Sequence, residues 1–377
     1  MHVLRILVVS LLAASVSVQA KAVTYAYVSS PEDGLISQYR LDETTGAVSL
    51  VEQIQAGAQV NPMALSPDGR ALYAALRAKP YTVKSYQIDK NSGHLSFTSE
   101  APLADSLAYL STDRSGRWLL GASYGGDLIS TQPIDANHHP EGQFQVVKTG
   151  PHAHSIRTDP SNRFAYAGNL GADRVLQYRF NAANGQLTAN GTGYVTLPAK
   201  TGPRHIAFSP DGHFLYVVGE MSGYVTGYAI DAKSGALREL GSASGIPDSL
   251  NLVHGEVRDA SNNNLEGDAT RRIWAADLRL SPDAKLLYMT ERTSSSVSAF
   301  SIASKTGKPV FLGNYPVQEH QPRNIAFSPN GRWLLVTGEK SPVVGSYAIG
   351  VHGSLNRVSE APSGKGALWI EMWQPHP

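Results

Sequence analysis

Two sets of mostly polar residues recur at fixed distances from a repeated short turn, and their types could support hydrolytic chemistry. Each member lies eight residues before or after the fourth position of a turn such as Ser66–Gly69 or Ser209–Gly212. The upstream set consists of Asn61, Ala108, His154, Arg204, Ala276 and Arg323. The downstream set consists of Arg77, Tyr124, Leu170, Glu220, Arg292 and Glu339. Because a hairpin folds about its turn, the two sets should meet at one level of the fold.

These residue types suit the attack of water on an ester. A carboxylate or a neutral imidazole can take the proton of the attacking water, and a fixed guanidinium can face the developing oxyanion. We therefore predict Glu220 or His154 as the base and Arg204 as the oxyanion donor. Further residues are predicted to bind the substrate, the first two at its anionic end: Arg292, Arg323, Arg77 and Tyr124. The alternative is that Arg–Glu pairs such as Arg323–Glu339 only tie the structure together.

The elements that carry these residues repeat seven times. Each copy has a β-branched residue, an aromatic residue three positions later and an aliphatic residue or Phe two positions after that, as in Ile36–Leu41 and Val83–Ile88. The copies begin at residues 36, 83, 129, 175, 225, 297 and 344, and in the third copy Gln132 replaces the aromatic residue. Such alternation of apolar residues predicts strands with one buried face.

The period predicts an all-β fold, a seven-bladed β-propeller. Short turns precede six of the seven copies, three of the type Ser-Pro-Asp/Asn-Gly and three looser versions, and polar turns such as Asp89–Gly93 follow the copies, so each period of 46–50 residues holds about four short strands. The first copy lacks its preceding turn, and residues 24–28 resemble the second strand of a blade. We therefore expect the C-terminal strand, residues 367–373, to complete the first blade and close the ring.

One step between copies measures 72 residues and predicts an insertion at about residues 245–272. Strand alternation places this insertion on the same face as the polar sets, where it could cover the channel mouth or form an exposed loop. His254 and Glu256 lie within it, and a metal site there is a weak hypothesis. The neighbouring His138 and His139 are expected to be solvated. We expect no metal and no cofactor.

Composition and the N-terminus restrict the remaining possibilities. The chain has 377 residues, a formal net charge of +1 and no cysteine, which excludes disulfides and thiolate chemistry and gives no reason to expect binding to nucleic acid. Residues 1–20 combine one arginine, a short apolar run and a small-x-small ending at Ala20, which predicts a secretory signal peptide. The prediction is a single propeller over residues 21–377, periplasmic or secreted, with no membrane contact after cleavage.

Several further motifs carry a resemblance to a known family. They are Gly202–His205 (GPRH), Glu220, Trp274–Asp277 (WAAD), Glu291–Thr293 (ERT) and Gln321–Arg323 (QPR). With the repeated turns, they make residues 22–374 similar to the seven-bladed propeller lactonases. That family includes the propeller-type bacterial 6-phosphogluconolactonase and the fungal carboxy-muconate lactonizing enzyme.

The resemblance implies a site at the channel mouth and a function in carbohydrate metabolism. Its matching positions here are His154, Arg204, Glu220 and Arg292, with Arg272 as a further substrate-binding candidate next to the insertion. It implies a hydrolase that opens a small-molecule sugar lactone, of the 6-phosphogluconolactonase type. Two alternatives stay open: a lyase or isomerase that acts on a carboxylated muconolactone, and a non-enzymatic propeller that binds a protein partner. The protein-binding alternative predicts exposed apolar residues at the mouth, where the sequence instead places charges.

Overall fold

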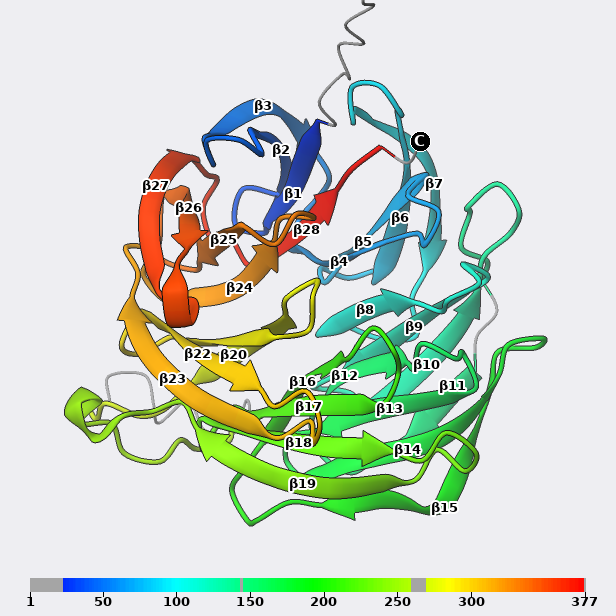
Figure 1. Cartoon of the computed structure of the whole chain (residues 1–377). Helices are drawn as coiled ribbons and strands as arrows, with labels where there is room; N and C mark the ends of the chain where they lie inside the picture. Colours follow the sequence, from blue (N-terminus) through cyan, green and yellow to red (C-terminus); the bar gives the residue numbers. More distant parts are fainter. Residues whose placement is uncertain (1–22, 143–144, 259–268, 376–377) are drawn as a thin grey trace, which may run out of the picture.

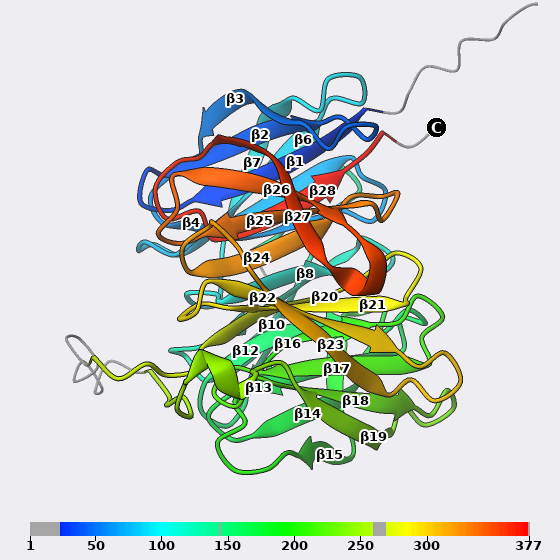
Figure 2. The same ribbon diagram turned by 60° about the vertical axis from the view of Figure 1, so that its left-hand side comes forward.

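The computed structural model describes residues 23–142, 145–258 and 269–375 of the chain. Its strands form seven four-stranded antiparallel sheets, which are arranged as the blades of a ring (Figure 1). Turned by 60°, the molecule is seen closer to edge-on, with the first blade at the top of the view (Figure 2). This confirms the predicted all-β, seven-bladed propeller. Residues 1–20, for which a signal peptide is predicted, lie outside the described residues.

The first blade takes strands from both ends of the chain. It consists of β28 (Trp369–Trp373), β1 (Thr24–Ser30), β2 (Leu35–Leu41) and β3 (Val48–Gln55). Strand β28 pairs antiparallel with β1, with Trp373 opposite Tyr25 and Trp369 opposite Ser29. The predicted closure by the C-terminal strand is confirmed, and it pairs the inner edge of β1 at the point where the ring begins and ends.

The other six blades follow one another along the chain, each from its innermost to its outermost strand. The innermost strands are β4 (Val60–Leu65), β8 (Tyr109–Thr112), β12 (Ala153–Thr158), β16 (Pro203–Phe208), β20 (Ala275–Leu280) and β24 (Pro322–Phe327). The second strands are β5 (Ala71–Leu76), β9 (Trp118–Ser123), β13 (Phe164–Asn169), β17 (Phe214–Gly219), β21 (Leu286–Glu291) and β25 (Trp333–Gly338). The third strands are β6 (Thr82–Ile88), β10 (Leu128–Pro133), β14 (Arg174–Asn181), β18 (Tyr224–Ile230), β22 (Ser296–Ile302) and β26 (Val343–Ile349). The outermost strands are β7 (Leu95–Pro102), β11 (Gln145–Lys148), β15 (Gln186–Thr196), β19 (Leu237–Ser244), β23 (Pro309–Pro316) and β27 (Leu355–Pro362). Short 3-10 helices span Asp248–Leu250 (η1) and Val351–Gly353 (η3).

Apolar layers between neighbouring blades form the core, and a repeated tyrosine contact locks them together. Tyr166 of β13 is fully buried, and its hydroxyl donates to the carbonyl of Gly235 in the next blade at 2.7 Å. Tyr216 of β17 donates in the same way to Gly307 at 3.0 Å. Gly235 has a φ of 72°, and a Cβ there would lie 2.2 Å from the ring of Phe164. Glycine is therefore required in this polar turn by both backbone conformation and packing.

The hairpin between the first two strands of a blade brings the two polar sets together. The backbone N–H of Glu220 donates to Gly202 at 2.8 Å, and that of Glu339 donates to Gln321 at 3.0 Å. Each bond joins a residue of the downstream set to the residue that lies two positions before its partner in the upstream set. We call this end of the ring, where the innermost strands begin, the mouth end. The end that holds the Ser66–Gly69 type of turn is the turn end.

The described parts of the insertion leave from the end of β19 and return at β20, and they touch the ring at the mouth end. Val253 forms an isolated parallel bridge with Arg272. The N–H of Gly255 donates to Met221, the residue after Glu220, at 2.8 Å. A Cβ on Gly255 would lie 2.4 Å from the carbonyl oxygen of Ile273, so glycine permits this close approach. Within the described ranges, no helix is both long and apolar enough to span a membrane.

Candidate active site

Three charged side chains from two blades form the centre of the mouth end. Arg204, at the start of β16, donates from Nε to Glu220 Oε2 at 2.6 Å. Arg292, which follows β21 in the next blade, places Nη2 2.9 Å from Glu220 Oε1. All three residues are buried. The sequence prediction that Arg204 and Glu220 meet at one level is confirmed by this contact, and each oxygen of the carboxylate faces a different guanidinium.

The two arginines fix the protonation state of Glu220. Burial alone would raise its pKa, but the charges of Arg292, Arg204 and Arg323 outweigh burial and hold the pKa at about 2. Burial lowers the pKa of Arg204 to about 9, even though Glu220 acts in the opposite direction. At neutral pH the carboxylate is therefore ionised and the guanidinium is protonated.

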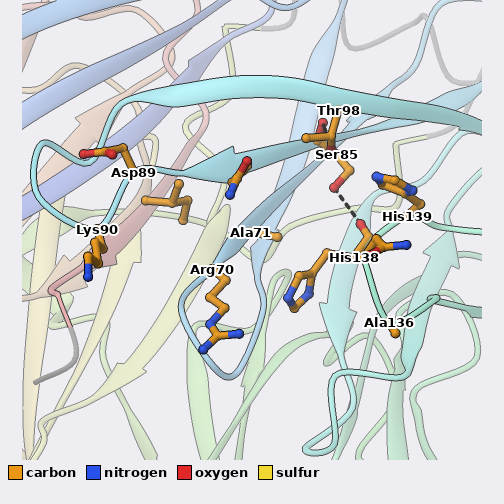
Figure 3. A pocket seen from close by; sticks show the side chains of 12 residues that line it. Arg70, Ala71, Ser85, Asp89, Lys90, Thr98, Ala136, His138 and His139 are labelled. Atoms are coloured by element: carbon orange, nitrogen blue, oxygen red, sulfur yellow. Dashed lines mark hydrogen bonds between the residues drawn. The ribbon is translucent and has the colours of Figure 1, made fainter.

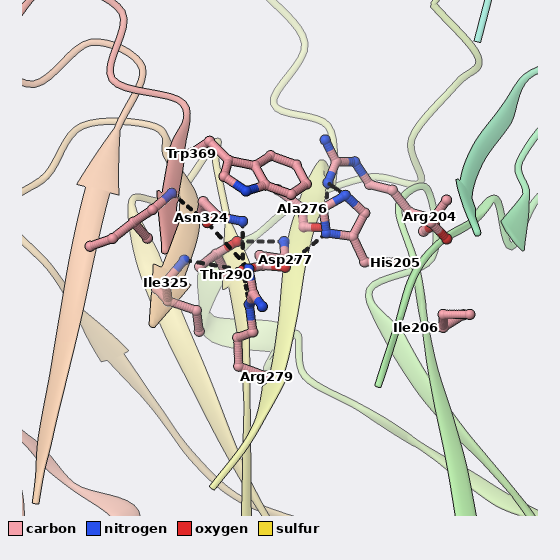
Figure 4. A network of polar contacts seen from close by, with 12 residues as sticks. Arg204, His205, Ile206, Ala276, Asp277, Arg279, Thr290, Asn324, Ile325 and Trp369 are labelled. Atoms are coloured by element: carbon pink, nitrogen blue, oxygen red, sulfur yellow. Dashed lines mark hydrogen bonds and ion pairs between the residues drawn. The ribbon is translucent and has the colours of Figure 1, made fainter. Parts of the chain in front are cut away.

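A second layer of contacts holds Arg204 from behind (Figure 4). Arg204 Nη1 donates to the carbonyl of Ala276 at 2.6 Å and lies 3.1 Å from Nε2 of His205. Since a guanidinium can only donate, His205 Nε2 must accept, and its ring proton is on Nδ1. That nitrogen lies 2.8 Å from Asp277 Oδ1. Burial lowers the pKa of His205 to about 4, in agreement with a neutral ring.

Asp277 anchors this layer to its own strand β20 and to β24 of the next blade. Its Oδ2 accepts from Arg279 at 3.0 Å, from the side-chain amide of Asn324 at 2.8 Å and from the N–H of Ile325 at 3.1 Å. Asn324 in turn accepts from the N–H of Ile370 in β28 at 2.9 Å. The position of Arg204 therefore depends on contacts that reach the C-terminal strand.

His154 stands beside this group on the innermost strand of the preceding blade. Its ring centroid lies 5.3 Å from that of His205 and 5.8 Å from that of Tyr124. The residue is buried, and its Nδ1 has no hydrogen-bond partner among the described residues. Burial and the nearby charge of Arg204 hold the pKa of His154 well below its usual 6.5. It is a neutral imidazole with an unused nitrogen.

Arg323 and Arg77 lie near the same group but are held differently. Arg323 Nη1 donates to Glu339 Oε2 of its own blade at 3.2 Å. Arg77 donates from Nε to the hydroxyl of Ser106 at 3.1 Å. Burial, and then the charge of Arg323, lower the pKa of Arg77. Both remain positioned to add positive charge at the mouth end.

Tyr124 and Arg272, the two candidates nearest the insertion, have different kinds of contact. Tyr124 stacks on His152 at 4.2 Å, and its hydroxyl donates to the carbonyl of Arg258 in the insertion at 2.6 Å. Arg272 is held by Glu256, with Nη1 and Oε1 3.0 Å apart, so Glu256 serves an ion pair in this arrangement. Arg272 is therefore engaged within the insertion, where its Nη1 also lies 3.5 Å from the carbonyl oxygen of His254.

Sequence reasoning missed three residues at this end. His205 and Asp277 lie inside the quoted GPRH and WAAD motifs, so adjacency to Arg204 and Ala276 was the available signal. Arg258 gave no signal, because it belongs to the aperiodic insertion. Its guanidinium lies 3.2 Å from the centroid of the Trp274 ring. After burial, the charge of Arg292 is the largest cause that lowers its pKa, which places it in the same electrostatic field.

The paired histidines His138 and His139 belong to a different region. They line a cavity of about 750 Å³ beside β6 and β7 of the second blade (Figure 3). His138 Nε2 lies 3.2 Å from Asp68 and His139 Nδ1 lies 3.5 Å from Asp135. Each therefore has its own carboxylate partner. Within the described ranges, no three His, Asp or Glu side chains are grouped so that they could hold a metal ion.

Comparison with known proteins agrees with this geometry. Residues 25–372 match the family described as "Lactonase, 7-bladed beta-propeller". The 6-phosphogluconolactonase of Yersinia pseudotuberculosis is 31% identical over 347 residues, which cover 92% of this chain and 97% of that protein. The corresponding protein of Pectobacterium carotovorum is 33% identical over the same coverage.

Solved structures give the same fold. The periplasmic gluconolactonase of Pseudomonas aeruginosa is 25% identical and superposes with a TM-score of 0.78, covering 93% of this chain and 99% of that one. A Lactobacillus plantarum protein superposes with a TM-score of 0.79 at 22% identity, covering 93% of this chain and 99% of that one. The second likeness concerns the fold alone.

Proposed function

The chain belongs to the 7-bladed beta-propeller lactonase family, and from this premise we propose that it hydrolyses a sugar lactone to the open aldonic acid. One observation carries the proposal: a buried carboxylate held between two guanidiniums, next to a neutral histidine with an unused nitrogen. Hydrolysis of an ester needs a proton acceptor for water and a positive charge for the oxyanion, and this group supplies both.

We assign the proton transfer to His154 rather than to Glu220. The two arginines hold the pKa of Glu220 at about 2, which makes its carboxylate a weak base at neutral pH. Both of its oxygens already face a guanidinium. Glu220 is then the residue that aligns Arg204 and Arg292, and the imidazole of His154 is the remaining acceptor. Its pKa is also lowered, and a bound anionic substrate would raise it by offsetting the nearby arginines.

The reaction then follows in two steps. Water attacks the lactone carbonyl carbon, its proton passes to His154, and the carbonyl oxygen becomes an oxyanion next to a guanidinium. The tetrahedral intermediate collapses, the bond from the carbonyl carbon to the ring oxygen breaks, and the proton on His154 passes to the departing alkoxide. The product is an aldonic acid, which ionises at neutral pH. Arg292 is the better placed oxyanion donor, since Arg204 is enclosed by Glu220, His205 and Ala276.

An excess of positive charge supports an anionic substrate. Five arginines lie at the mouth end: Arg77, Arg204, Arg258, Arg292 and Arg323. Among the described residues, the carboxylates that pair with them are Glu220 and Glu339. Guanidiniums bind carboxylates and phosphates with paired hydrogen bonds. This favours a lactone that carries a phosphate, of the 6-phosphogluconolactonase type, as the names of the sequence relatives suggest.

The proposed compartment is the periplasm. Residues 1–20 have the order of a secretory signal, and one structural neighbour is a periplasmic gluconolactonase. The lyase and protein-binding alternatives are not favoured, because the relatives are named lactonases and the mouth end is charged.

The test is lactone hydrolysis by the purified protein on gluconolactone with and without a 6-phosphate, corrected for spontaneous opening. We expect catalysis of at least one lactone, with the phosphorylated form showing the lower KM. His154→Gln should reduce kcat by a hundredfold or more, as loss of a general base does, while the exposed control Glu239→Gln keeps the wild-type rate. A wild-type rate in folded His154→Gln would transfer the base role elsewhere, and activity on neither lactone would refute the proposal.

A further inference from the structure

A second polar cavity lies around the axis of the ring at the turn end, opposite the site described above. Its volume is about 240 Å³. Residues from five blades line it, including Tyr109, Arg114, Arg157, Thr158, Arg279 and Glu371. It is therefore a feature of the assembled ring rather than of any one blade.

The positive charges that line this cavity are incompletely paired. Arg279 has a carboxylate partner, since its Nε lies 3.0 Å from Asp277. Among the described residues, Arg157 has a long contact from Nη1 to the carbonyl of Ile206 at 3.5 Å and lies 6.0 Å from the ring centroid of Phe208, but it has no carboxylate within 4.0 Å. Arg114 is exposed, and the described residues provide its side chain with no hydrogen bond and no ion pair.

The remaining wall places no carboxylate within 4.0 Å of Arg157 or Arg114 among the described residues. Glu371 is the carboxylate of β28 at this cavity, where burial raises its pKa and the charges of Arg279 and Arg157 act in the opposite direction. Its Oε1 already accepts from the indole of Trp369 at 2.7 Å. Asp113 is occupied by the N–H groups of Arg117 and Trp118, at 2.9 Å each, and by the amide of Asn162 at 2.7 Å.

A buried hydroxyl on the same wall also lacks a partner. Thr158, at the end of β12 next to Arg157, is 2% exposed, and its Oγ1 has no hydrogen-bond partner among the described residues. Buried hydroxyls are normally satisfied by protein or by ordered solvent. An unpaired hydroxyl next to unpaired guanidiniums is the arrangement expected where an external oxygen-rich group completes the contacts.

Aromatic rings separate this cavity from the mouth end. Tyr109, His205 and Trp369 come from the innermost strands of three different blades, so they meet near the axis. Their centroids are 5.0 Å apart for Tyr109 and His205, 5.3 Å for Tyr109 and Trp369, and 5.8 Å for His205 and Trp369. A ligand at the turn end would thus not touch Glu220 or Arg292, and the turn-end cavity is a distinct site.

We propose that the turn-end cavity binds a small oxyanion of the phosphate or carboxylate class, held by Arg157, Arg114 and the hydroxyl of Thr158. At about 30 Å³ per water molecule, a cavity of about 240 Å³ accommodates such an anion with a few waters. Arginine suits this ligand because its planar fork can donate two parallel hydrogen bonds to two oxygens of one group. This inference does not depend on the proposed lactonase reaction.

The test is isothermal titration calorimetry of the purified full-length protein at low ionic strength. The probes are inorganic phosphate, gluconate as the carboxylate, and glucose as an uncharged control. We expect at least one of the two anions to bind and glucose not to bind. Arg157→Gln should weaken binding at least tenfold, whereas the exposed Arg238→Gln should bind as the wild type does.

Two further variants separate this site from the mouth end and from loss of folding. Thr158→Val has nearly the same shape and removes a hydroxyl with no protein partner, so it should fold and should weaken binding several-fold. Because the mouth end can bind the same anions, Arg323→Gln should weaken only a separate binding event and should leave the one that Arg157→Gln weakens unchanged. The proposal is overturned if neither anion binds, if Thr158→Val and folded Arg157→Gln bind as tightly as the wild type, or if only Arg323→Gln loses binding.

Discussion

The fifth and seventh blades carry the same ion pair at the same places, and the two pairs differ in almost every physical respect. Arg204 and Glu220 are 16 residues apart, as are Arg323 and Glu339. In the fifth blade the side chains are 2% and 11% exposed and the contact is 2.6 Å long. In the seventh blade they are 23% and 29% exposed and the contact is 3.2 Å long.

The neighbouring blades produce this difference. Arg292 of the sixth blade adds a second cation to Glu220, and Ala276 and His205 accept from Arg204. The blade that follows the seventh is the first, where Pro31 directly follows the second strand β1 at the place that Arg292 occupies after β21, so this position supplies no second cation. A pair predicted from spacing thus becomes a buried cluster or a half-exposed contact according to what the next blade supplies. Burial makes the two pairs respond differently to mutation, pH and salt.

The largest expected effect follows the loss of Arg204. Arg204→Ala removes one of the two cations from a buried carboxylate, and breaking one side of a buried ion pair costs about 3–5 kcal/mol. We also expect kcat/KM to fall a hundredfold or more, because Arg204 no longer holds the carboxylate of Glu220 in the position that orients Arg292. Urea unfolding and lactone hydrolysis measure the two effects. A folded variant with wild-type stability and rate would show that the fifth-blade pair is no more important than its seventh-blade counterpart.

The next largest effect is expected in acid, where Glu220 and Glu339 should contribute differently to the free energy of unfolding. The folded pKa of Glu220 is about 2 against an ordinary 4.5, so its ionised form stabilises the native state fully above about pH 4.5. This contribution is lost as the pH falls from 4.5 towards 2, and it amounts to roughly 3 kcal/mol at 1.36 kcal/mol per pKa unit. Glu220→Gln should flatten stability against pH in this window. Glu339→Gln, at the half-exposed pair, should flatten it far less, and equal slopes would remove the distinction.

A smaller effect is expected in the seventh blade itself. Arg323→Gln breaks a half-exposed pair, for which losses of about 0.2–1 kcal/mol are typical. In the wild type, the charge of Arg323 acts at the mouth end. Its loss should therefore raise KM for the phosphorylated lactone a few-fold and leave kcat nearly unchanged. Raising the salt concentration should reduce the wild-type advantage. A fall in kcat as large as that of Arg204→Ala would place Arg323 in the chemistry rather than in binding.

The smallest effect concerns the third blade, where the downstream position is Tyr124. Tyr124→Phe removes the hydrogen bond to the carbonyl of Arg258 and keeps the stacking on His152. We expect a stability change of about 1 kcal/mol or less and a modest rise in KM, if Arg258 is held near the substrate by this bond. Thermal unfolding and steady-state kinetics provide the measurement. An unchanged KM would indicate that the insertion does not contribute to substrate binding.

The strand repeat allowed most of the fold and half of the site to be predicted. The period, the missing first turn and the hairpin spacing together predicted seven blades, the closing strand and the meeting of Arg204 with Glu220. Arg292 was identified by the same spacing in another blade, and His154 by its equivalence to Arg204. His205 and Asp277 were not identified, because adjacency in sequence does not show which nitrogen of a histidine faces an arginine of its own strand.

What the sequence by itself determined is the set of positions at each level of the ring, because side-chain alternation and turn geometry are local and repeat with the period. What only the tertiary structure decided is which equivalent positions become buried, which cations converge on one carboxylate, and which charges at the turn end stay unpaired. These outcomes depend on contacts between residues of different blades, such as Asp277 with Asn324, 47 positions apart, and Tyr39 with Pro362, 323 positions apart. How deeply a side chain is buried and which charges pair with it depend on several such neighbours at once. A seven-fold repeat in sequence therefore yields a single buried charge cluster at the mouth end among the described residues.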